Sequence, residues 1–151
     1  MDGAGHNNAQ EGADGEIAMM GWLEERGVEL LHVNRVLRAH EDHKFIAGIP
    51  DGAGRLNGDT FLIECKHTQA WPDFLTRDGE LKTTSHPYYQ IIGLLEIFNI
   101  EQCWLMCQVA NQEPFLAAIV QRNRAVFNGR MLNRLWDFYI NHMLPMAFRA
   151  L

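Results

Sequence analysis

The sequence predicts an α/β domain in which helices flank a central mixed β-sheet. Helical and strand-like segments alternate in the order helix, three strands, helix, two strands, helix, which is typical of a sheet covered by helices. A chain of 151 residues, 47% of them hydrophobic, is large enough to bury one continuous core. The segment at 60–67, TFLIECKH, is rich in β-forming residues and lies near the middle of the chain, as a central strand would.

The N-terminal part is expected to contain a tail followed by a helix. Residues 1–13 are rich in Gly, Ala, Asn and Gln, so we expect a flexible tail there and a single domain over 14–151. Asp14 can cap a helix over 15–26, and Gly27 can end it. The residues at helical spacing that would face the core are Ala13, Glu16, Ile17, Met20 and Leu23. This places a carboxylate, that of Glu16, on the inner side.

Three strands are predicted to follow. They cover residues 28–33, 43–49 and 60–67, with the turn signal PDGAG after the second strand and the polar turn RLNGD before the third. In the third strand, alternation puts Leu62, Glu64 and Lys66 on one face. The opposite face receives Phe61, Ile63 and Cys65.

The C-terminal half is expected to contain a helix, two strands and further helices. A long polar connection at 68–84 is typical of a functional loop, and Ser85 and Pro87 open an apolar helix that runs to about Phe98. Residues 103–109 and 115–120 are predicted strands. Helical segments over 122–148, with breaks at Gly129 and Pro145, would carry one apolar stripe made of Met131, Leu132, Leu135, Trp136, Tyr139 and Met143. That surface can serve either as core or as a contact between subunits.

Composition narrows the class of protein. No stretch reaches the roughly 18 consecutive apolar residues of a membrane span, and the N-terminus lacks the pattern of a secretory signal, so we expect a cytoplasmic protein without membrane contact. Cys65, Cys103 and Cys107 lie in apolar runs, which favours reduced core thiols. The seven histidines form no HExxH or HxH cluster, which argues against a zinc hydrolase. The net charge of −6 argues against binding of nucleic acid through bulk electrostatics.

Three residues have the chemistry that hydrolysis of a phosphodiester needs. Asp51 follows one predicted strand in GIPDG, and Glu64 and Lys66 share one face of the next in LIECK. A hairpin between the two strands would bring both carboxylates together, and carboxylate oxygens suit Mg²⁺ or Mn²⁺. Lys66 would then lie where it can orient or deprotonate an attacking water. The sequence therefore predicts a site for a divalent metal ion with an adjacent ammonium group.

This pattern resembles that of the PD-(D/E)XK nuclease superfamily, whose fold is restriction-endonuclease-like. IPDG followed by IECK matches its signature, an acidic residue on the first helix is matched by Glu16, and a Gln on the helix after the motif is matched by Gln90. The resemblance implies that Asp51 and Glu64 bind Mg²⁺ or Mn²⁺ with support from Glu16 and the backbone carbonyl of Cys65. It also implies that Lys66 assists the attacking water and that Gln90 orients Lys66 or the water. The catalytic set expected from it is Asp51, Glu64, Lys66 and Gln90.

The pattern is most similar to phage λ-type and YqaJ-like viral exonucleases, with VRR-type nucleases as the second choice. This resemblance implies an enzyme of DNA recombination, repair or phage replication that leaves a 5′-phosphate, contains one or two metal ions and forms a homo-oligomer, a dimer or a trimer. The alternatives are a structure-specific endonuclease or Holliday junction resolvase, an RNA-cleaving endonuclease, and a catalytically silent nucleic-acid-binding module of the same fold. Arg35, Arg38 and His67 are the candidates for contacts with the DNA phosphates.

Overall fold

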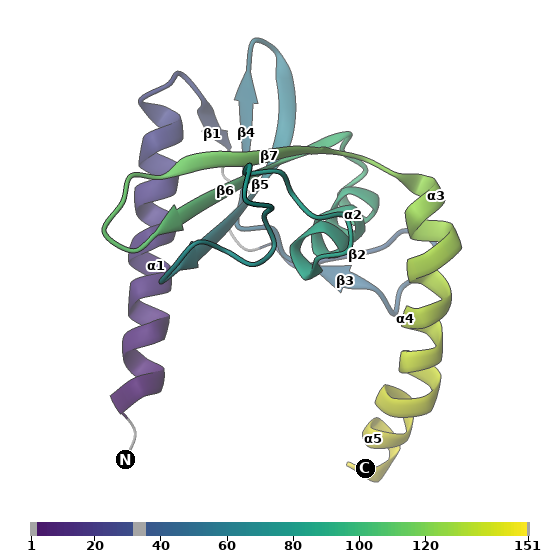
Figure 1. Ribbon diagram of the computed structural model, residues 1–151. Coiled ribbons are helices and arrows are strands. Elements are labelled where there is room, and N and C mark those ends of the chain that lie inside the picture. Colours follow the sequence, from purple (N-terminus) through teal and green to yellow (C-terminus); the bar gives the residue numbers. More distant parts are fainter. Residues whose placement is uncertain (1–2, 32–35, 151) are drawn as a thin grey trace.

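The computed structural model describes residues 3–31 and 36–150, and its centre is a five-stranded mixed sheet. The strand order is β1 (Glu29–Leu31), β4 (Gly52–Leu56), β5 (Asp59–Thr68), β6 (Gln102–Val109) and β7 (Phe115–Gln121). Strands β5 and β6 are parallel, and the other neighbours are antiparallel (Figure 1). A separate pair, β2 (Arg38–Ala39) and β3 (Ala47–Gly48), is antiparallel. The predicted mixed sheet is confirmed.

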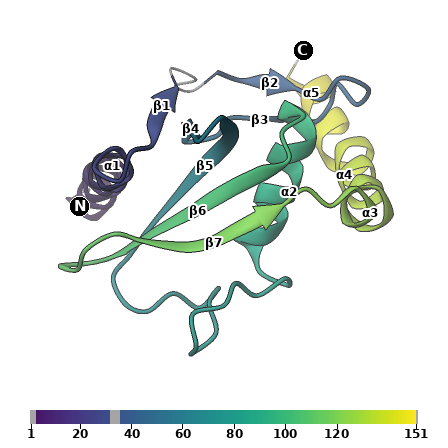
Figure 2. The same cartoon turned by 90° about the horizontal axis from the view of Figure 1, so that it is seen from above.

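Helices cover the two faces of this sheet. Helix α1 (Gly3–Glu24) lies on one face and α2 (His86–Phe98) on the other (Figure 2). Under α1, Met19 and Leu23 pack with Phe61 and Ile63 of β5, whereas Leu62 of β5 packs in the cluster that contains the buried residues of α2. The alternation predicted for 60–67 is therefore correct, and the two faces of β5 contribute to two separate cores.

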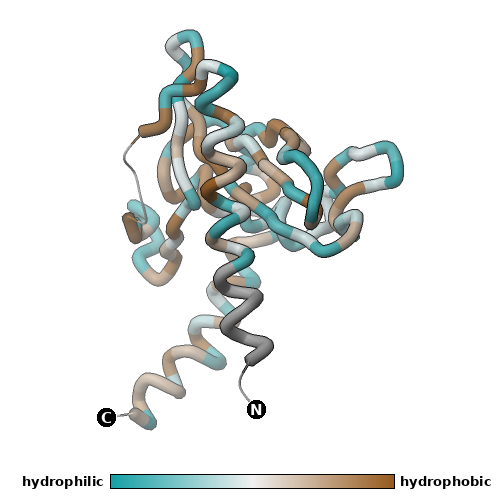
Figure 3. The backbone as a smooth tube through the Cα atoms, turned by 90° about the vertical axis from the view of Figure 1, so that its left-hand side faces the viewer, coloured by the Kyte–Doolittle hydropathy of each residue, from teal (hydrophilic) through white to brown (hydrophobic). Residues whose placement is uncertain are grey.

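Helix α1 differs from its prediction at its start. It begins at Gly3 and needs no cap at Asp14, so the predicted start at residue 15 is wrong, while residues 1 and 2 lie outside the described part of the chain. Once the packed turns around Met19 form, each added residue gains a hydrogen bond at little cost in nucleation. A hydrogen bond of 2.9 Å from Gln69 Nε2 to Glu11 Oε2 also holds the helix to the end of β5. The part of α1 that Figure 3 colours by hydropathy passes in front of the sheet in that view.

The buried side of α1 also differs. Ile17 is 71% exposed, whereas Met19 is 1% exposed, and the buried positions are Gly15, Met19 and Leu23. At Gly15 an added Cβ would lie 2.9 Å from Cδ2 of His67, so the helix approaches β5 through a residue without a side chain. Hydrophobic periodicity does not count glycine as a contact residue, and the predicted stripe was displaced for that reason.

The second predicted strand and the turn after it are corrected. PDGAG is the entry into β4, and of 43–49 only Ala47–Gly48 is a strand. Strand β4 begins with small residues, Gly52 to Gly54, because the space above it is filled: an added Cβ at Gly54 would lie 2.8 Å from Cγ1 of Val28 and 2.9 Å from Phe61. The β4–β5 turn is at Asn57 and Gly58, whose φ angles of 52° and 89° suit Asn and Gly. The first predicted strand, 28–33, is observed at 29–31, and residues 32 and 33 lie outside the described part of the chain.

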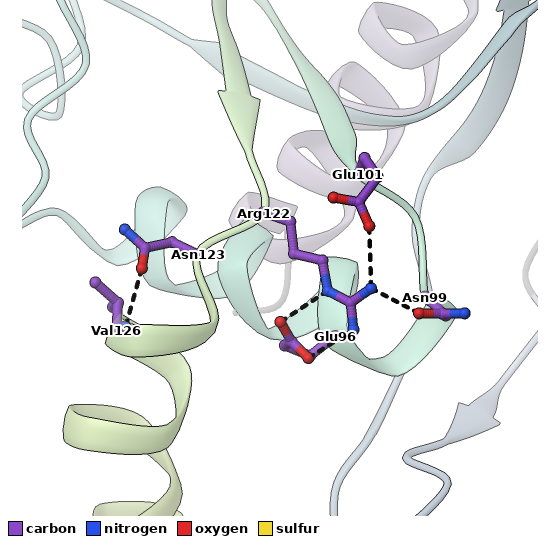
Figure 4. A network of polar contacts seen from close by, with 6 residues as sticks. All are labelled: Glu96, Asn99, Glu101, Arg122, Asn123 and Val126. Carbon is purple, nitrogen blue, oxygen red and sulfur yellow. Dashed lines mark hydrogen bonds and ion pairs between the residues drawn. The ribbon is translucent and has the colours of Figure 1, made fainter.

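The predictions for α2, β6 and β7 are confirmed. Ser85 is the N-cap of α2 and Pro87 lies in its first turn, while the helix ends at Asn99, whose φ of 54° is left-handed. Arg122, just after β7, connects that strand to the end of α2. Its guanidinium donates two hydrogen bonds of 2.8 Å to the Glu96 carboxylate and others to Asn99 and Glu101 (Figure 4). Strands β6 and β7 and helix α2 are thereby joined at one corner of the domain.

The C-terminal segment is one continuous helix that leaves the body of the domain (Figure 1). It consists of α3 (Arg124–Val126), the π-helical η1 (Phe127–Met131), α4 (Leu132–Phe138), the π-helical η2 (Tyr139–Met143) and α5 (Leu144–Arg149). The predicted breaks are wrong, because the helix continues through Gly129, which lies in η1, and through Pro145, which lies directly after the π-helical η2. Several large apolar side chains of this helix are exposed, namely Trp136, Phe138, Met143, Met146 and Phe148.

None of the helices in residues 3–31 and 36–150 combines the length and the apolar character that a membrane crossing requires.

Candidate active site

The β4–β5 hairpin brings Asp51 to Glu64. Gly52 pairs with Ile63, so Asp51 stands beside the position of Glu64 at the point where β4 begins. The backbone N–H of Cys65 donates a 2.7 Å hydrogen bond to Oδ2 of Asp51. The predicted hairpin is therefore present, and this bond fixes the Asp51 carboxylate against β5.

Glu64, Lys66 and Gln90 form a closed set of hydrogen bonds between β5 and α2. Lys66 Nζ lies 2.9 Å from Oε1 of Glu64, and Gln90 Nε2 donates a 2.6 Å bond to the same oxygen. Lys66 Nζ also donates a 3.0 Å bond to Oε1 of Gln90. Glu64 and Gln90 are 26 positions apart along the sequence, and their side chains are in contact between β5 and the first turns of α2.

The buried carboxylate of Glu64 is electrostatically costly. Its residue is 2% exposed, and burial, followed by the neighbouring Asp51 carboxylate, raises the pKa of Glu64 above its usual value. The ammonium of Lys66 and the hydrogen bond from Gln90 oppose this shift without cancelling it. Its second oxygen, Oε2, is buried and finds no hydrogen-bond partner among the described residues. A buried carboxylate oxygen without a donor is a group that a cation would satisfy.

Glu16 of α1 lies near the same point from the other side of the sheet. Burial raises the pKa of the Cys65 thiol, and the carboxylates of Asp51, Glu16 and Glu64 raise it further. Three carboxylates therefore act on one residue of β5. Cys65 keeps its proton at neutral pH, which leaves its backbone carbonyl as the group with which it can bind a cation.

The donor set fits a hard divalent cation, although the side chains are not gathered around one. Among the described side chains, those of residues 11–31 and 36–150, no three His, Cys, Asp or Glu groups are close enough together to hold one ion. Asp51 and Glu64 nevertheless supply carboxylate oxygens on adjacent strands, and Oε2 of Glu64 is unsatisfied within this part of the chain. Oxygen donors of this kind select Mg²⁺ or Mn²⁺ over softer ions.

The three predicted phosphate contacts are distributed differently. Arg35 lies outside the described residues. Arg38 is exposed on β2, and its guanidinium lies 5.7 Å from the ring centroid of Phe98, at the opposite end of α2 from Gln90. His67 is on the α1 face of β5 and lines a hollow of about 370 Å³ with Glu11 and Asp14, which is an acidic neighbourhood for a phosphate ligand. The structure thus brings neither Arg38 nor His67 into the set formed by Glu64, Lys66 and Gln90.

A groove beside Gln90 contains residues that sequence reasoning did not single out as functional. It has a volume of about 280 Å³, and its lining includes Ile49, Tyr89, Gln90, Met131 and Leu135. Tyr89 stands next to Gln90 in the YYQ segment, which was the only signal in the sequence that pointed toward it. Met131 and Leu135 line the groove because the C-terminal helix crosses α2 at this point, and the local sequence does not specify that crossing.

Comparison of the fold with solved structures finds an exonuclease. The chain superposes with a TM-score of 0.60 on LHK-Exo in complex with dAMP, at 21% identity over 94% of this chain and 74% of that chain. It also superposes on the alkaline exonuclease LHK-Exo from Laribacter hongkongensis, with a TM-score of 0.58 and 20% identity over 95% of this chain and 75% of that chain. The expected restriction-endonuclease-like fold is thereby confirmed. The sequence matches no protein-family model. It also matches no curated protein.

Proposed function

We propose that this protein is a metal-dependent nuclease that hydrolyses DNA phosphodiester bonds. The observation that carries the proposal is the buried carboxylate of Glu64, which binds Lys66 and Gln90 through one oxygen, while its other oxygen has no hydrogen-bond partner among the described residues. A binding module has no need of such a costly group in its core. The shared fold with an alkaline exonuclease supports the same class of reaction.

In this proposal Asp51 and Glu64 hold the cation, with Glu16 and the Cys65 carbonyl beside them. The cation, when bound, supplies the positive charge that polarises the phosphate and makes a water molecule more acidic. Lys66 Nζ, already held by Glu64 and Gln90, positions the attacking water and stabilises negative charge that develops on the phosphate. Gln90 fixes the direction of the Lys66 ammonium through Oε1 and so reduces the reorganisation needed during the reaction.

The finer parts of the proposal come from the sequence pattern together with the fold. We assign the chain to exonuclease-like enzymes of DNA recombination, repair or phage replication that leave a 5′-phosphate and a free 3′-hydroxyl. A homo-oligomer, a dimer or a trimer, is part of this assignment. Its support is the exposed apolar surface of the C-terminal helix, where Met146 and Phe148 are 68% and 70% exposed.

The test is a cleavage assay on DNA of different shapes. Purified protein is incubated with labelled linear duplex, closed circles and four-way junctions, in Mg²⁺ and in EDTA. We expect metal-dependent loss of linear duplex while closed circles survive. Cleaved circles or resolved junctions would replace the exonuclease assignment with a structure-specific endonuclease. Absence of cleavage in every arm would refute the nuclease proposal and leave a binding module.

The matched variants are Lys66→Ala and Lys44→Ala. Lys44 is an exposed lysine in the connection between β2 and β3. Both substitutions remove the same charge and the same side chain, so a change seen only in Lys66→Ala reports on the site and not on net charge.

A further inference from the structure

One segment near the C-terminal end of the chain contains arginines and no acidic residues. Residues 114–136 contain four arginines and no Asp or Glu, in a protein whose net charge is −6. Arg122 is used within the fold, since its guanidinium is bound by Glu96, Asn99 and Glu101. Arg130 and Arg134 are exposed, and neither has a hydrogen bond or an ion pair with any described residue. They stand one helical turn apart on the C-terminal helix and therefore face the same direction.

The groove described above connects this pair of arginines to the candidate active site. One wall contains Ile49, two residues before Asp51, and another contains Gln90, whose amide binds Glu64 and Lys66. The third wall is the C-terminal helix, through Met131 and Leu135. The groove thus reaches Gln90, the member of the catalytic set that is in its lining, and runs between α2 and the C-terminal helix.

A second hollow continues it outward. It has a volume of about 170 Å³ and is lined by Tyr89, Arg130, Met131, Arg134 and Leu135. Tyr89, Met131 and Leu135 line both hollows, so the two form one surface. Its lining combines apolar and aromatic side chains, those of Tyr89, Met131 and Leu135, with the two arginines.

We propose that this groove holds a single strand of DNA on its way to the active site. Bases have flat apolar faces that pack on an aromatic ring and on aliphatic side chains, which Tyr89, Met131 and Leu135 provide. Phosphates are bound by guanidinium groups, and neither Arg130 nor Arg134 is held in an ion pair by a carboxylate of the described residues. A duplex presents its phosphates outward and hides its bases, so it would leave the apolar lining in contact with water. The inference rests on the proposed function for the identity of the strand as substrate.

The test separates strand binding from cleavage. Fluorescence anisotropy of a 5′-labelled oligothymidylate is measured in EDTA, where metal-dependent cleavage cannot proceed, over a range of salt concentrations. For Arg130→Gln/Arg134→Gln we expect affinity about tenfold weaker or more, because two charge-assisted contacts are lost. The salt slope should fall by about 1.4, since each phosphate contact on a single strand contributes roughly 0.7. The matched control is Arg124→Gln/Arg149→Gln, which removes the same charge from exposed arginines elsewhere on the C-terminal helix and should retain the wild-type slope.

A second pair of variants tests the aromatic part of the lining. Tyr89→Leu should weaken binding roughly fivefold to a hundredfold through loss of base stacking, and Tyr89→Phe should bind like wild type. Equal affinity and equal salt slope in wild type and Arg130→Gln/Arg134→Gln would overturn the inference. A change in oligomeric state without a change in strand binding would also overturn it, because the groove would then be a protein contact. Strand binding that depends on Arg130, Arg134 and Tyr89 supports the groove even if wild-type protein cleaves no DNA, an outcome that refutes only the proposed nuclease.

Discussion

Replacing Glu64 by Gln should make the protein more stable at neutral pH while it removes activity. The substitution preserves the shape of the side chain and an acceptor oxygen for Lys66 and Gln90, and it removes a buried negative charge. Glu64 is 2% exposed, whereas 27% of the Lys66 side chain is accessible. Lys66 therefore keeps part of its hydration when its partner is neutral, and the attraction that is lost is small beside the cost of burying the carboxylate.

The direction of this effect follows from the raised pKa of Glu64. Burial and repulsion by Asp51 disfavour the ionised form more than Lys66 and Gln90 favour it, so the folded protein holds its proton to higher pH than the unfolded chain. The stabilisation from protonated Glu64 is complete below the unfolded pKa of 4.5 and is lost as pH rises through the folded value. At pH 7 we expect Glu64→Gln to gain about 1–2 kcal/mol, as substitutions of costly functional groups commonly do. This corresponds to a rise in Tm of roughly 2–8 °C for a domain of this size.

The measurement is thermal unfolding followed by circular dichroism from pH 4 to pH 8 in EDTA. The advantage of Glu64→Gln over wild type should be small at pH 4 and should increase toward pH 7. Asp59→Asn is the control, because Asp59 is an exposed carboxylate at the first position of β5 and its removal should change stability by less than about 0.5 kcal/mol. A Glu64→Gln variant that is less stable than wild type at pH 7, or a difference that is independent of pH, would refute the reasoning.

Four further outcomes are expected. Lys66→Ala should lower kcat on DNA by about 10²–10⁴, measured by release of labelled nucleotides, and a smaller loss than tenfold would argue against its role with water. Mg²⁺ at about 100 times its Kd should stabilise wild type by roughly 2.7 kcal/mol in thermal unfolding and should not stabilise Asp51→Asn; equal stabilisation would place the ion elsewhere. Arg122→Ala should cost about 3 kcal/mol in urea unfolding at pH 7, because it leaves the Glu96 carboxylate buried and unpaired. Hydrogen bonds from Arg122 lower the pKa of Glu96 in the folded protein. The stability that this ion pair contributes is therefore present above the unfolded pKa of 4.5 and is lost as pH falls through the folded pKa. An equal cost of Arg122→Ala at pH 2 would contradict this assignment. Light scattering should give two or three chains per particle for wild type and fewer for Phe138→Ser, whereas a wild-type monomer would remove the proposed oligomer.

Strong local signals in the sequence predicted the centre of the fold. Strand β5 has β-forming residues and strict alternation, and α2 has a serine cap, a proline in its first turn and an apolar interior. Both elements were predicted within a few residues of their observed bounds. The pairing of Asp51 with β5 also followed, because a short polar turn between two strands leaves few other arrangements.

Elements that depend on tertiary contacts were predicted less well. Strand β4 begins with Gly-Ala-Gly, which indicates a turn by local preference, and it forms a strand because Gly54 lies under Val28 and Phe61. Gly15 of α1 is buried against His67 for the same kind of reason. In both cases a neighbouring side chain occupies the space that a Cβ on the glycine would need. Hydrophobic periodicity gives no sign of such a contact, because glycine has no side chain to count.

The catalytic residues of the candidate site could likewise be predicted from local sequence, whereas the groove beside them could not. Asp51, Glu64, Lys66 and Gln90 were recognisable because their spacing matches a known pattern, and the structure brings them together. The groove that leads to Arg130 and Arg134 requires the C-terminal helix to cross α2, and that crossing is not encoded in any short segment. The acid-free run at 114–136 was the available signal, and its significance depends on where the helix lies.

The central claim is that Asp51, Glu64 and Lys66 form the site of a metal-dependent hydrolysis of DNA. The most direct measurement is the initial rate of nucleotide release from one labelled linear duplex as Mg²⁺ is titrated, for wild type and Lys66→Ala in parallel. We predict a rate that rises with Mg²⁺ to saturation in wild type, vanishes in EDTA and is at least about a hundredfold lower in Lys66→Ala. A rate that is independent of Mg²⁺, or equal in the two proteins, would contradict the claim.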